Sequence, residues 1–327
     1  MPRIIEGDAA TPLLLNKTRR KNSFRWAGTL AGLALLVLVG FQIRSQVQAG
    51  RGYTGVHFSQ SGYGIAAVLL LFFSLAVESR KWQLLLRRSL PGVSFGASLR
   101  SVFCGIAASV VTPNRLGEYP GRMLRLERIS PYKVATAAVL GSLSQFVALF
   151  TWGAIASAHY AFSRPVWWTV TGAILSGIGA VLSGIFFARY ERFIPRLQRI
   201  PFLRKYATLG RTMGSTDFNH QFTILALSLL RFAVFTFQYW LMLRWLGVPL
   251  PMIEGFLRCS LFFWIMAVVP SIALAEIGVR GGVALFLFAP YSADRIGILA
   301  ATLALWLLNL AIPSLTGALL LLRRPKP

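Results

Sequence analysis

Long apolar runs separated by short polar and basic stretches dominate the chain. A helix of roughly 20 residues crosses the hydrocarbon core of a bilayer. We expect spanning helices over six runs, at approximately residues 25–43, 61–77, 134–158, 166–188, 221–243 and 296–322. Two more apolar segments, about 95–124 and 253–289, contain Pro and Gly, which break helices. The pattern predicts an all-α polytopic membrane protein.

Composition supports this class. Of the 327 residues, 55% are hydrophobic and 13% charged, against about 25% charged in soluble globular proteins. A net charge of +24 can favour nucleic acid, but most basic residues flank the apolar runs, so we expect no nucleic-acid partner. Cys104 and Cys259 lie in apolar runs without His or Cys at metal-ligand spacing. We therefore expect no disulfide framework, no metal and no cofactor.

The two interrupted segments share a pattern of charges. Residues 100–122 and 258–280 align without a gap, and every charged residue of the second copy has a match in the first. The matched charges are Arg100 with Arg258, Glu118 with Glu276, and Arg122 with Arg280. Paired apolar segments that Gly and Pro interrupt at corresponding positions of two halves indicate the binding site of a transporter. We expect the function to reside in this repeat.

The distribution of Lys and Arg predicts the orientation, because loops rich in these residues stay in the cytoplasm. With the tail 1–24 inside, the basic loop 189–218 and the tail 323–327 also fall inside if segment 95–124 enters and leaves on one side. The basic residues left outside are Arg44, Arg51, Arg164, Arg244 and Arg295. Those at membrane depth are Arg100, Arg231, Arg258 and Arg280. This asymmetry predicts that the two repeat segments are re-entrant helical hairpins.

Three spanning helices lie between the two hairpins, and an odd number of crossings turns the second hairpin upside down. We therefore expect six spanning helices plus two re-entrant hairpins in an inverted repeat. They form one transmembrane domain, 25–322, with halves at about 25–160 and 164–322. The alternative is a bundle of eight spanning helices, in which the two segments are parallel. We expect a multi-pass protein of a bacterial or archaeal plasma membrane, with both termini in the cytoplasm.

The repeated charges have a spacing that suits a binding site. Glu118 and Arg122 are four residues apart, as are Glu276 and Arg280, which places each pair on one face of a helix. One interpretation is a structural ion pair that neutralises itself. In the other, the carboxylate contacts a cationic or hydroxyl-rich head group and the guanidinium holds a phosphate. Duplication in opposed halves favours the second, because charges inside a membrane are costly and usually functional. The candidate substrate-binding residues are Glu118, Arg122, Glu276, Arg280, Arg115, Asn114 and Arg231.

Other polar residues in the apolar runs carry weaker signals. Arg231 lies in the middle of a predicted span and either pairs with a glutamate of the repeat or reaches a phosphate. Arg100 and Arg258 open the two repeat segments, and we interpret them as snorkelling to the interface. Glu78 follows the end of a predicted span and precedes basic residues, so we interpret it as interfacial. Either a cavity lining or interhelical hydrogen bonds explain Asn114, Gln145, Gln238 and Asn309.

The two motifs resemble the transmembrane region of the lysylphosphatidylglycerol synthase/flippase family. They read Pro113-x-Arg115-x-Gly117-Glu118 followed by Arg122, and Glu276-x-Gly278-x-Arg280-Gly281-Gly282. The resemblance covers roughly residues 25–322. The second motif departs from the family, which more often has Pro-Gly-Gly-x-Gly in the place of Pro270-Ser271-Ile272-Ala273. Family members look like lipid flippases, sometimes fused to a soluble synthetase that adds an amino acid to phosphatidylglycerol. We expect only the lipid-moving part here, without the synthetase domain.

The resemblance and the repeat together predict a flippase that moves a phospholipid or a polyisoprenyl-phosphate-linked lipid between leaflets. Its head group is expected between the two hairpins, with the tails in the bilayer, so membrane lipids, anionic ones first, are the expected partners. A membrane-embedded lipid-modifying enzyme is one alternative. No His lies near the repeated carboxylates and no nucleotide motif is present, so we do not expect an enzyme. A scaffold or accessory subunit for a lipid- or glycan-synthesis enzyme is the other alternative.

Overall fold

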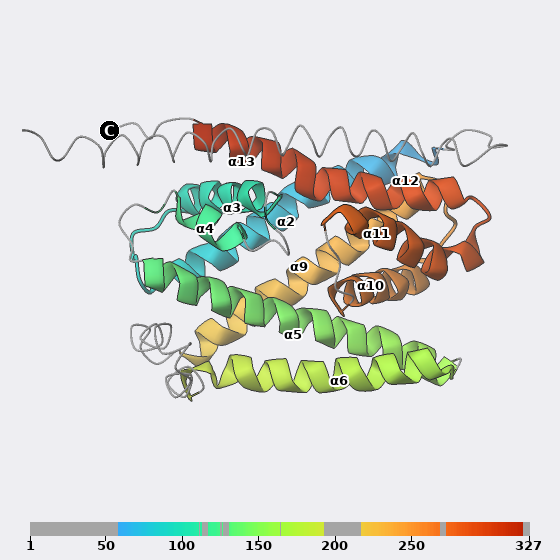
Figure 1. The fold of residues 1–327 in the computed structure, drawn as a ribbon, viewed down its shortest axis with the longest axis horizontal. Coiled ribbons are helices and arrows are strands. Elements are labelled where there is room, and N and C mark those ends of the chain that lie inside the picture. The colour runs from blue at the N-terminus through green and yellow to red at the C-terminus, as the bar shows by residue number, and fades with distance from the viewer. Residues whose placement is uncertain are drawn as a thin grey trace, which may run out of the picture.

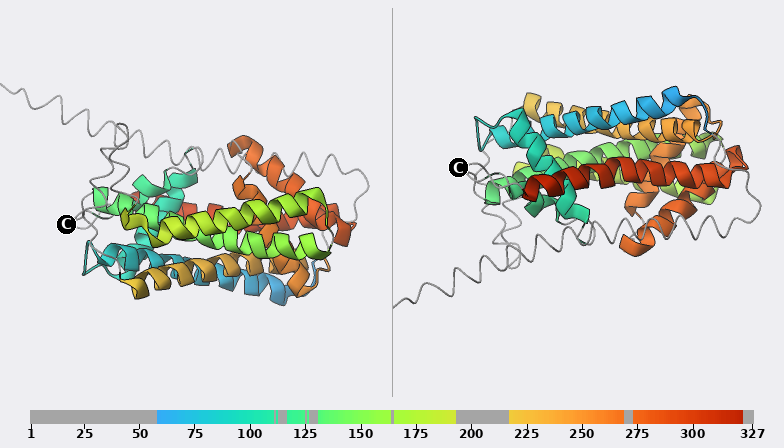
Figure 2. Two further views of the ribbon diagram at one scale, coloured as in Figure 1. Left: turned by 90° about the horizontal axis from the view of Figure 1, so that it is seen from below. Right: turned by 90° about the horizontal axis from the view of Figure 1, so that it is seen from above.

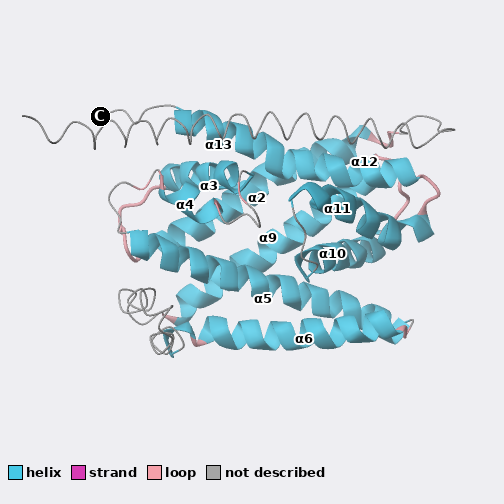
Figure 3. Cartoon of the chain, viewed as in Figure 1, coloured by secondary structure: helices cyan, strands magenta, loops and turns pink. Residues whose placement is uncertain are grey.

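The computed structural model describes residues 58–110, 112, 117–124, 126, 131–163, 165–192, 217–268 and 273–322. Every regular element in these ranges is a helix (Figure 3), which confirms the predicted all-α class. The elements are α2 (Ser61–Arg87), α3 (Phe95–Val110), α4 (Glu118–Met123), α5 (Pro131–Ser163), α6 (Trp167–Ala188), α9 (Phe218–Trp245), α10 (Met252–Val268), α11 (Ala273–Phe288), η4 (Ala289–Tyr291), α12 (Arg295–Trp306), η5 (Leu307–Ala311) and α13 (Ile312–Leu322). The predicted tail 1–24, the predicted span 25–43, most of the basic loop 189–218 and the tail 323–327 lie outside the described residues.

Five described helices are long and apolar enough to cross a membrane. They are α2, Lys133–Ser163 of α5, α6, α9 and the stretch Arg295–Leu322. α6 is an example. It is apolar on all sides, and its Trp167, Ile174 and Val181 side chains are exposed, as those of a lipid-facing helix are. The chain is therefore a multi-pass membrane protein. The exact number of spans stays a prediction.

The two repeat segments form helix pairs at opposite ends of the bundle. Figures 1 and 2 show α3 and α4 near one end and α10 and α11 near the other. α3 has 16 residues, which at a rise of 1.5 Å per residue gives about 24 Å, less than the roughly 30 Å hydrocarbon core. α3 alone is thus too short to span a membrane. The re-entrant, inverted arrangement remains the prediction that fits these lengths.

Buried apolar side chains gather in two clusters, one around each repeat segment. The first includes Trp82, Leu85, Val102 and Val134. The second includes Tyr239, Phe262, Phe288 and Ile298. α2 and α9 pack side by side and contribute to both clusters. Glu78 on α2 and Arg231 on α9 fall, along their helices, between the residues of the two clusters.

The end of α9 sets the position of the second repeat segment. Gly247 has a φ of 81°, a left-handed conformation that glycine adopts without steric cost. The N–H of Gly247 donates to the Arg244 carbonyl at 3.3 Å, and the N–H of Val248 donates to the Leu243 carbonyl at 2.9 Å. These two bonds form a Schellman motif, which satisfies the last carbonyls of the helix. The chain therefore reverses after Trp245 and enters α10.

The last membrane-length helix contains a π-helical turn, Leu307–Ala311, between α12 and α13. Pro313 follows this turn and lacks the N–H that an α-helix would use at that position. The Asn309 amide donates to Gln238 Oε1 at 3.0 Å, and Gln238 Nε2 donates to the carbonyl of Ala67 at 2.8 Å. Interhelical hydrogen bonds, one of the two interpretations that the sequence left open, account for Gln238 and Asn309.

Candidate functional site

A carboxylate on α2 is the centre of a buried charged cluster. Glu78 is 4% exposed. Its Oε2 lies 2.9 Å from Lys81 Nζ and 3.3 Å from Arg231 Nε, and its Oε1 lies 2.7 Å from Arg122 Nη2. The cations come from α2, α4 and α9. We name the following residues the Glu78 cluster: Glu78, Lys81, Glu118, Arg122, Gln145 and Arg231.

The interpretation of Glu78 as interfacial is wrong. α2 continues to Arg87, well past the predicted end of the span at Val77, and Glu78 is buried where α2 packs against its neighbours. Charges usually end a membrane segment because burying them is costly. Here cations on other helices neutralise the carboxylate, and local sequence does not reveal such partners. Trp82 could have indicated from the sequence that α2 stays buried past Glu78, because a large apolar residue beyond the charges continues the buried face of the helix.

Arg122 forms the predicted pair with Glu118 and a second pair with Glu78. Its Nη2 donates to Glu118 Oε1 at 2.5 Å and to Glu78 Oε1 at 2.7 Å. The guanidinium lies over the ring of Trp82, 4.8 Å from the centroid. Trp82 Nε1 donates to Ser101 Oγ at 3.0 Å, and that hydroxyl donates to the carbonyl of Arg122 at 2.7 Å. α2 and α3 thus fix the position of this arginine.

Gln145 on α5 contacts the two cations that lie near Glu78 Oε2, Lys81 and Arg231. Its Oε1 accepts hydrogen bonds from Lys81 Nζ at 3.3 Å and from Arg231 Nη1 at 3.4 Å. The Arg231 guanidinium also lies 5.5 Å from the ring centroid of Phe235. Arg231 therefore pairs with Glu78, a carboxylate outside the repeat, which sequence reasoning did not connect to it.

The charges of the cluster do not balance. Among the residues that the structure describes, Lys81, Arg122 and Arg231 face two carboxylates, Glu78 and Glu118, which leaves one excess positive charge in this set. The side chain of Glu78 is 6% exposed, but those of Arg231 and Glu118 are 27% and 29% exposed. Among the described residues, no three His, Cys, Asp or Glu side chains come together to hold a metal ion. An uncompensated buried cation is unfavourable, so the cluster is suited to take up an anionic group.

The second repeat segment is described only in part. Arg280 lies on α11, half-buried and within electrostatic reach of the buried Tyr239. Asn114, Arg115 and the side chain of Glu276 lie outside the described part of the chain. α11 lies toward the opposite end of the bundle from α4 (Figure 1). The structure thus brings Glu118, Arg122 and Arg231 together and places α11 at the other end.

Arg258 belongs to a second charged cluster. Its Nε lies 2.9 Å from Glu254 Oε1, and its Nη1 donates to the carbonyl of Leu287 at 2.9 Å. The guanidinium lies 4.9 Å from the ring centroid of Tyr160 and 4.4 Å from that of Tyr291, whose hydroxyl donates to Glu254. The interpretation of Arg258 as snorkelling is wrong, because its head group is bonded inside the protein. The pair of Glu254 and Arg258 neutralises itself.

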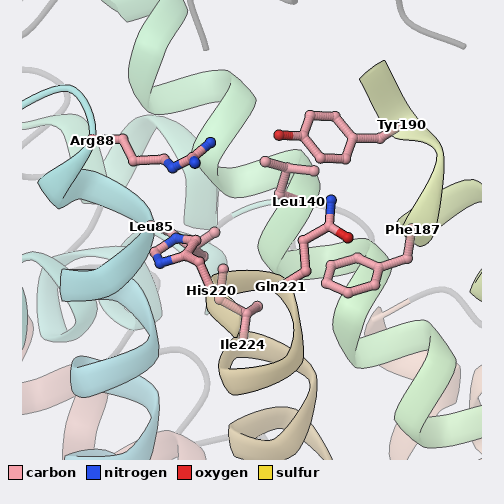
Figure 4. Close-up of a pocket in the computed structure, with 8 residues that line it drawn as sticks. All are labelled: Leu85, Arg88, Leu140, Phe187, Tyr190, His220, Gln221 and Ile224. Carbon is pink, nitrogen blue, oxygen red and sulfur yellow. The ribbon is translucent and has the colours of Figure 1, made fainter. Parts of the chain in front are cut away.

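A separate pocket lies between α2, α5, α6 and α9 (Figure 4). Its enclosed space is about 10 Å³, roughly the room that one water molecule needs. It is lined by Leu85, Arg88, Leu140, Phe187, Tyr190, His220, Gln221 and Ile224. Burial raises the pKa of Tyr190 to about 12, so its hydroxyl stays protonated at neutral pH. No residue of the Glu78 cluster lines this pocket, and we do not include it in the candidate site.

A bundle of membrane-length helices with charged groups buried inside it defines a polytopic membrane protein. The chain matches the family described as Lysylphosphatidylglycerol synthase TM region over residues 25–317, and it belongs to that family. The match is to the transmembrane region, as the resemblance predicted, and makes the chain a membrane-embedded, lipid-related protein. No curated protein and no solved structure is significantly similar to it.

Proposed function

We propose that the protein is a transporter that moves a phospholipid or a polyisoprenyl-phosphate-linked lipid between the two leaflets. The observation that supports this proposal most directly is the Glu78 cluster, because it places an excess cation inside an apolar bundle. The lipid head group passes this cluster, and the tails stay in the bilayer. Membership of a lipid-related family supports a lipid as the substrate.

The excess charge distinguishes the Glu78 cluster from a structural ion pair. Glu254 and Arg258 form such a pair, with one charge of each sign. In the Glu78 cluster the cations outnumber the carboxylates, and Arg231 is more exposed than Lys81 or Arg122. Arginine suits phosphate because its planar fork donates two parallel hydrogen bonds. A phosphate-bearing head group therefore supplies the missing negative charge.

The repeat supports a mechanism that exposes the site to either leaflet. The helix pairs α3–α4 and α10–α11 lie toward opposite ends of the bundle (Figure 2). In transporters built from inverted repeats, the two halves rock against each other around a site near the midplane. In this proposal the first pair contacts the head group from one leaflet and the second pair contacts it from the other. The repeat residues assigned to these contacts are Asn114, Arg115, Glu118, Arg122, Glu276 and Arg280.

Translocation of fluorescent lipids in liposomes that contain only the purified protein tests this proposal. A labelled phospholipid and a labelled polyisoprenyl-phosphate lipid are examined in separate preparations, and an impermeant quencher reports the fraction in the outer leaflet. We expect the wild type to move at least one of them faster than protein-free liposomes do. Glu118→Gln and Glu276→Gln should each slow the movement roughly tenfold or more, because the loss of a hydrogen bond to a charged group has an effect of about that size.

The alternatives predict a different result in the same assay. A scaffold for a lipid- or glycan-synthesis enzyme gives no movement of either lipid by folded wild-type protein. A lipid-modifying enzyme changes the chemical identity of the lipid, which extraction and mass spectrometry detect. Either outcome would overturn the transporter proposal.

A further inference from the structure

The two sides of the Glu78 cluster differ in the number of carboxylates that their cations contact. On one side, Arg122 Nη2 donates to two carboxylates, those of Glu78 and Glu118. On the other side, Lys81 and Arg231 share a single carboxylate oxygen, Glu78 Oε2, at 2.9 Å and 3.3 Å. The excess positive charge of the cluster therefore lies on the side of Lys81 and Arg231.

Gln145 occupies the place where a second anionic oxygen would be expected. Its neutral amide oxygen accepts from Lys81 Nζ at 3.3 Å and from Arg231 Nη1 at 3.4 Å. Hydrogen bonds from such cations to an anionic oxygen are shorter, about 2.7–2.9 Å. Arg231 Nε and Arg122 Nε are both buried without a hydrogen-bond partner among the described residues, so the two sides differ in their carboxylate partners and not in this respect. Beyond Glu78 Oε2, Lys81 and Arg231 thus share one neutral acceptor, Gln145 Oε1.

We propose that Lys81, Arg231 and Gln145 form the binding site for the head-group phosphate, which we name the phosphate seat. We propose that it accepts a phosphodiester with a single negative charge. This inference rests on the proposed function and assigns the phosphate to residues outside the repeat. One phosphate oxygen takes the position of Gln145 Oε1 between Lys81 and Arg231. The Gln145 amide then turns and donates its N–H to a second phosphate oxygen, because an amide offers both an acceptor and donors.

The charge of the cluster sets the class of phosphate. One negative charge cancels the excess of one cation. A phosphomonoester carries about −1.5 to −2 at neutral pH, which leaves uncompensated negative charge in the interior. The phosphate enters from the side of Arg231, because 27% of the Arg231 side chain is exposed, against 3% of the Lys81 side chain. Glycerophospholipids with an esterified head group, such as phosphatidylglycerol, and polyisoprenyl phosphosugars both present a phosphodiester, so both are sources of this chemistry.

Gln145→Glu tests the seat directly. The substitution places a permanent carboxylate between Lys81 and Arg231 without a change in size, and it makes the cluster neutral. We expect the ligand-free variant to be at least as resistant to thermal unfolding as the wild type, and to bind phosphodiesters at least about tenfold more weakly, the factor that one lost charged contact represents. Gln221→Glu, in the pocket of Figure 4, is the matched control and should bind like the wild type.

The binding probes are soluble, short-chain lipids, titrated into the full-length protein in detergent micelles. They are dihexanoylphosphatidylglycerol, a short-chain isoprenyl phosphoglucose and dihexanoylphosphatidic acid, which is a monoester. Binding of either phosphodiester more tightly than the monoester, lost in Gln145→Glu, supports the seat, and the preferred probe identifies the source of the phosphodiester. Unchanged binding by Gln145→Glu, equal or tighter binding of the monoester, or no binding of any probe by the wild type overturns it. Wild-type translocation in liposomes alongside such a failure would leave the transporter proposal standing.

Discussion

Glu78 joins three cations that would otherwise repel one another in a buried position. Removing one partner of a buried ion pair costs about 3–5 kcal/mol, because the other charge stays buried without compensation. We expect Glu78→Gln to lower the free energy of unfolding by about that amount. Glu118→Gln should cost about 1 kcal/mol or less, because Glu118 is partly exposed and Arg122 keeps its bond to Glu78. Thermal unfolding of both variants in detergent micelles measures the difference, and equal losses would contradict it.

The sequence predicted part of this site at the level of residues. The four-residue spacing predicted that Glu118 and Arg122 lie on one helix face, and they do pair. The bonds of Gln145 to Lys81 and Arg231 join positions 64 and 86 residues apart. No local pattern encodes such contacts, because they depend on how α2, α5 and α9 pack. The phosphate seat was therefore beyond sequence reasoning, although each of its residues was visible as a polar residue in or beside an apolar run.

At the scale of elements, hydropathy located the described spans but misplaced the end of α2. Five of the six predicted runs contain membrane-length helices, because a run of apolar residues of that length has few other stable forms. α2 extends to Arg87, since Glu78 and Lys81 neutralise each other and find further partners. In the repeat segments α3 and α10 end shortly before Pro113 and Pro270, as predicted, but α4 contains Pro120 and α11 continues through three glycines that were also expected to break it: Gly278, Gly281 and Gly282. The π-helical turn Leu307–Ala311 was not predicted. Pro313, which lacks a backbone N–H, could have indicated an irregular turn at this place in the helix.

The packing of α13 on α3 gives an element-scale prediction. A Cβ at Gly317 would lie 2.0 Å from the carbonyl oxygen of Phe103, whereas a Cβ at Gly184 on α6 would meet nothing within 4 Å. We expect Gly317→Ala to destabilise the fold by about 1–3 kcal/mol through overpacking. Gly184→Ala should instead stabilise it by up to about 1 kcal/mol, because alanine favours a helix. Thermal unfolding of the two variants should shift in opposite directions, and a shared direction would refute the close approach of α3 and α13.

At the scale of the whole molecule, the inverted repeat predicts which side of the membrane each helix pair enters from. Substituted cysteines at Ser94 and Leu124 flank α3–α4, and those at Met252 and Ala293 flank α10–α11 and η4; all four positions are exposed. In intact cells, an impermeant maleimide should label only Met252→Cys and Ala293→Cys. The natural cysteines are buried and should give no background. Labelling of Ser94→Cys and Leu124→Cys from different sides would instead support the bundle of eight spanning helices.

Translocation by Arg231→Gln in liposomes tests the central claim most directly. The substitution leaves two cations and two carboxylates in the Glu78 cluster, so the protein should stay folded while its excess positive charge is lost. Arg100→Gln, an exposed arginine at predicted membrane depth, is the matched control. We predict that Arg231→Gln moves lipid at least about tenfold more slowly than the wild type and that Arg100→Gln moves it at the wild-type rate. Equal rates for Arg231→Gln and the wild type would show that the head group does not pass the Glu78 cluster.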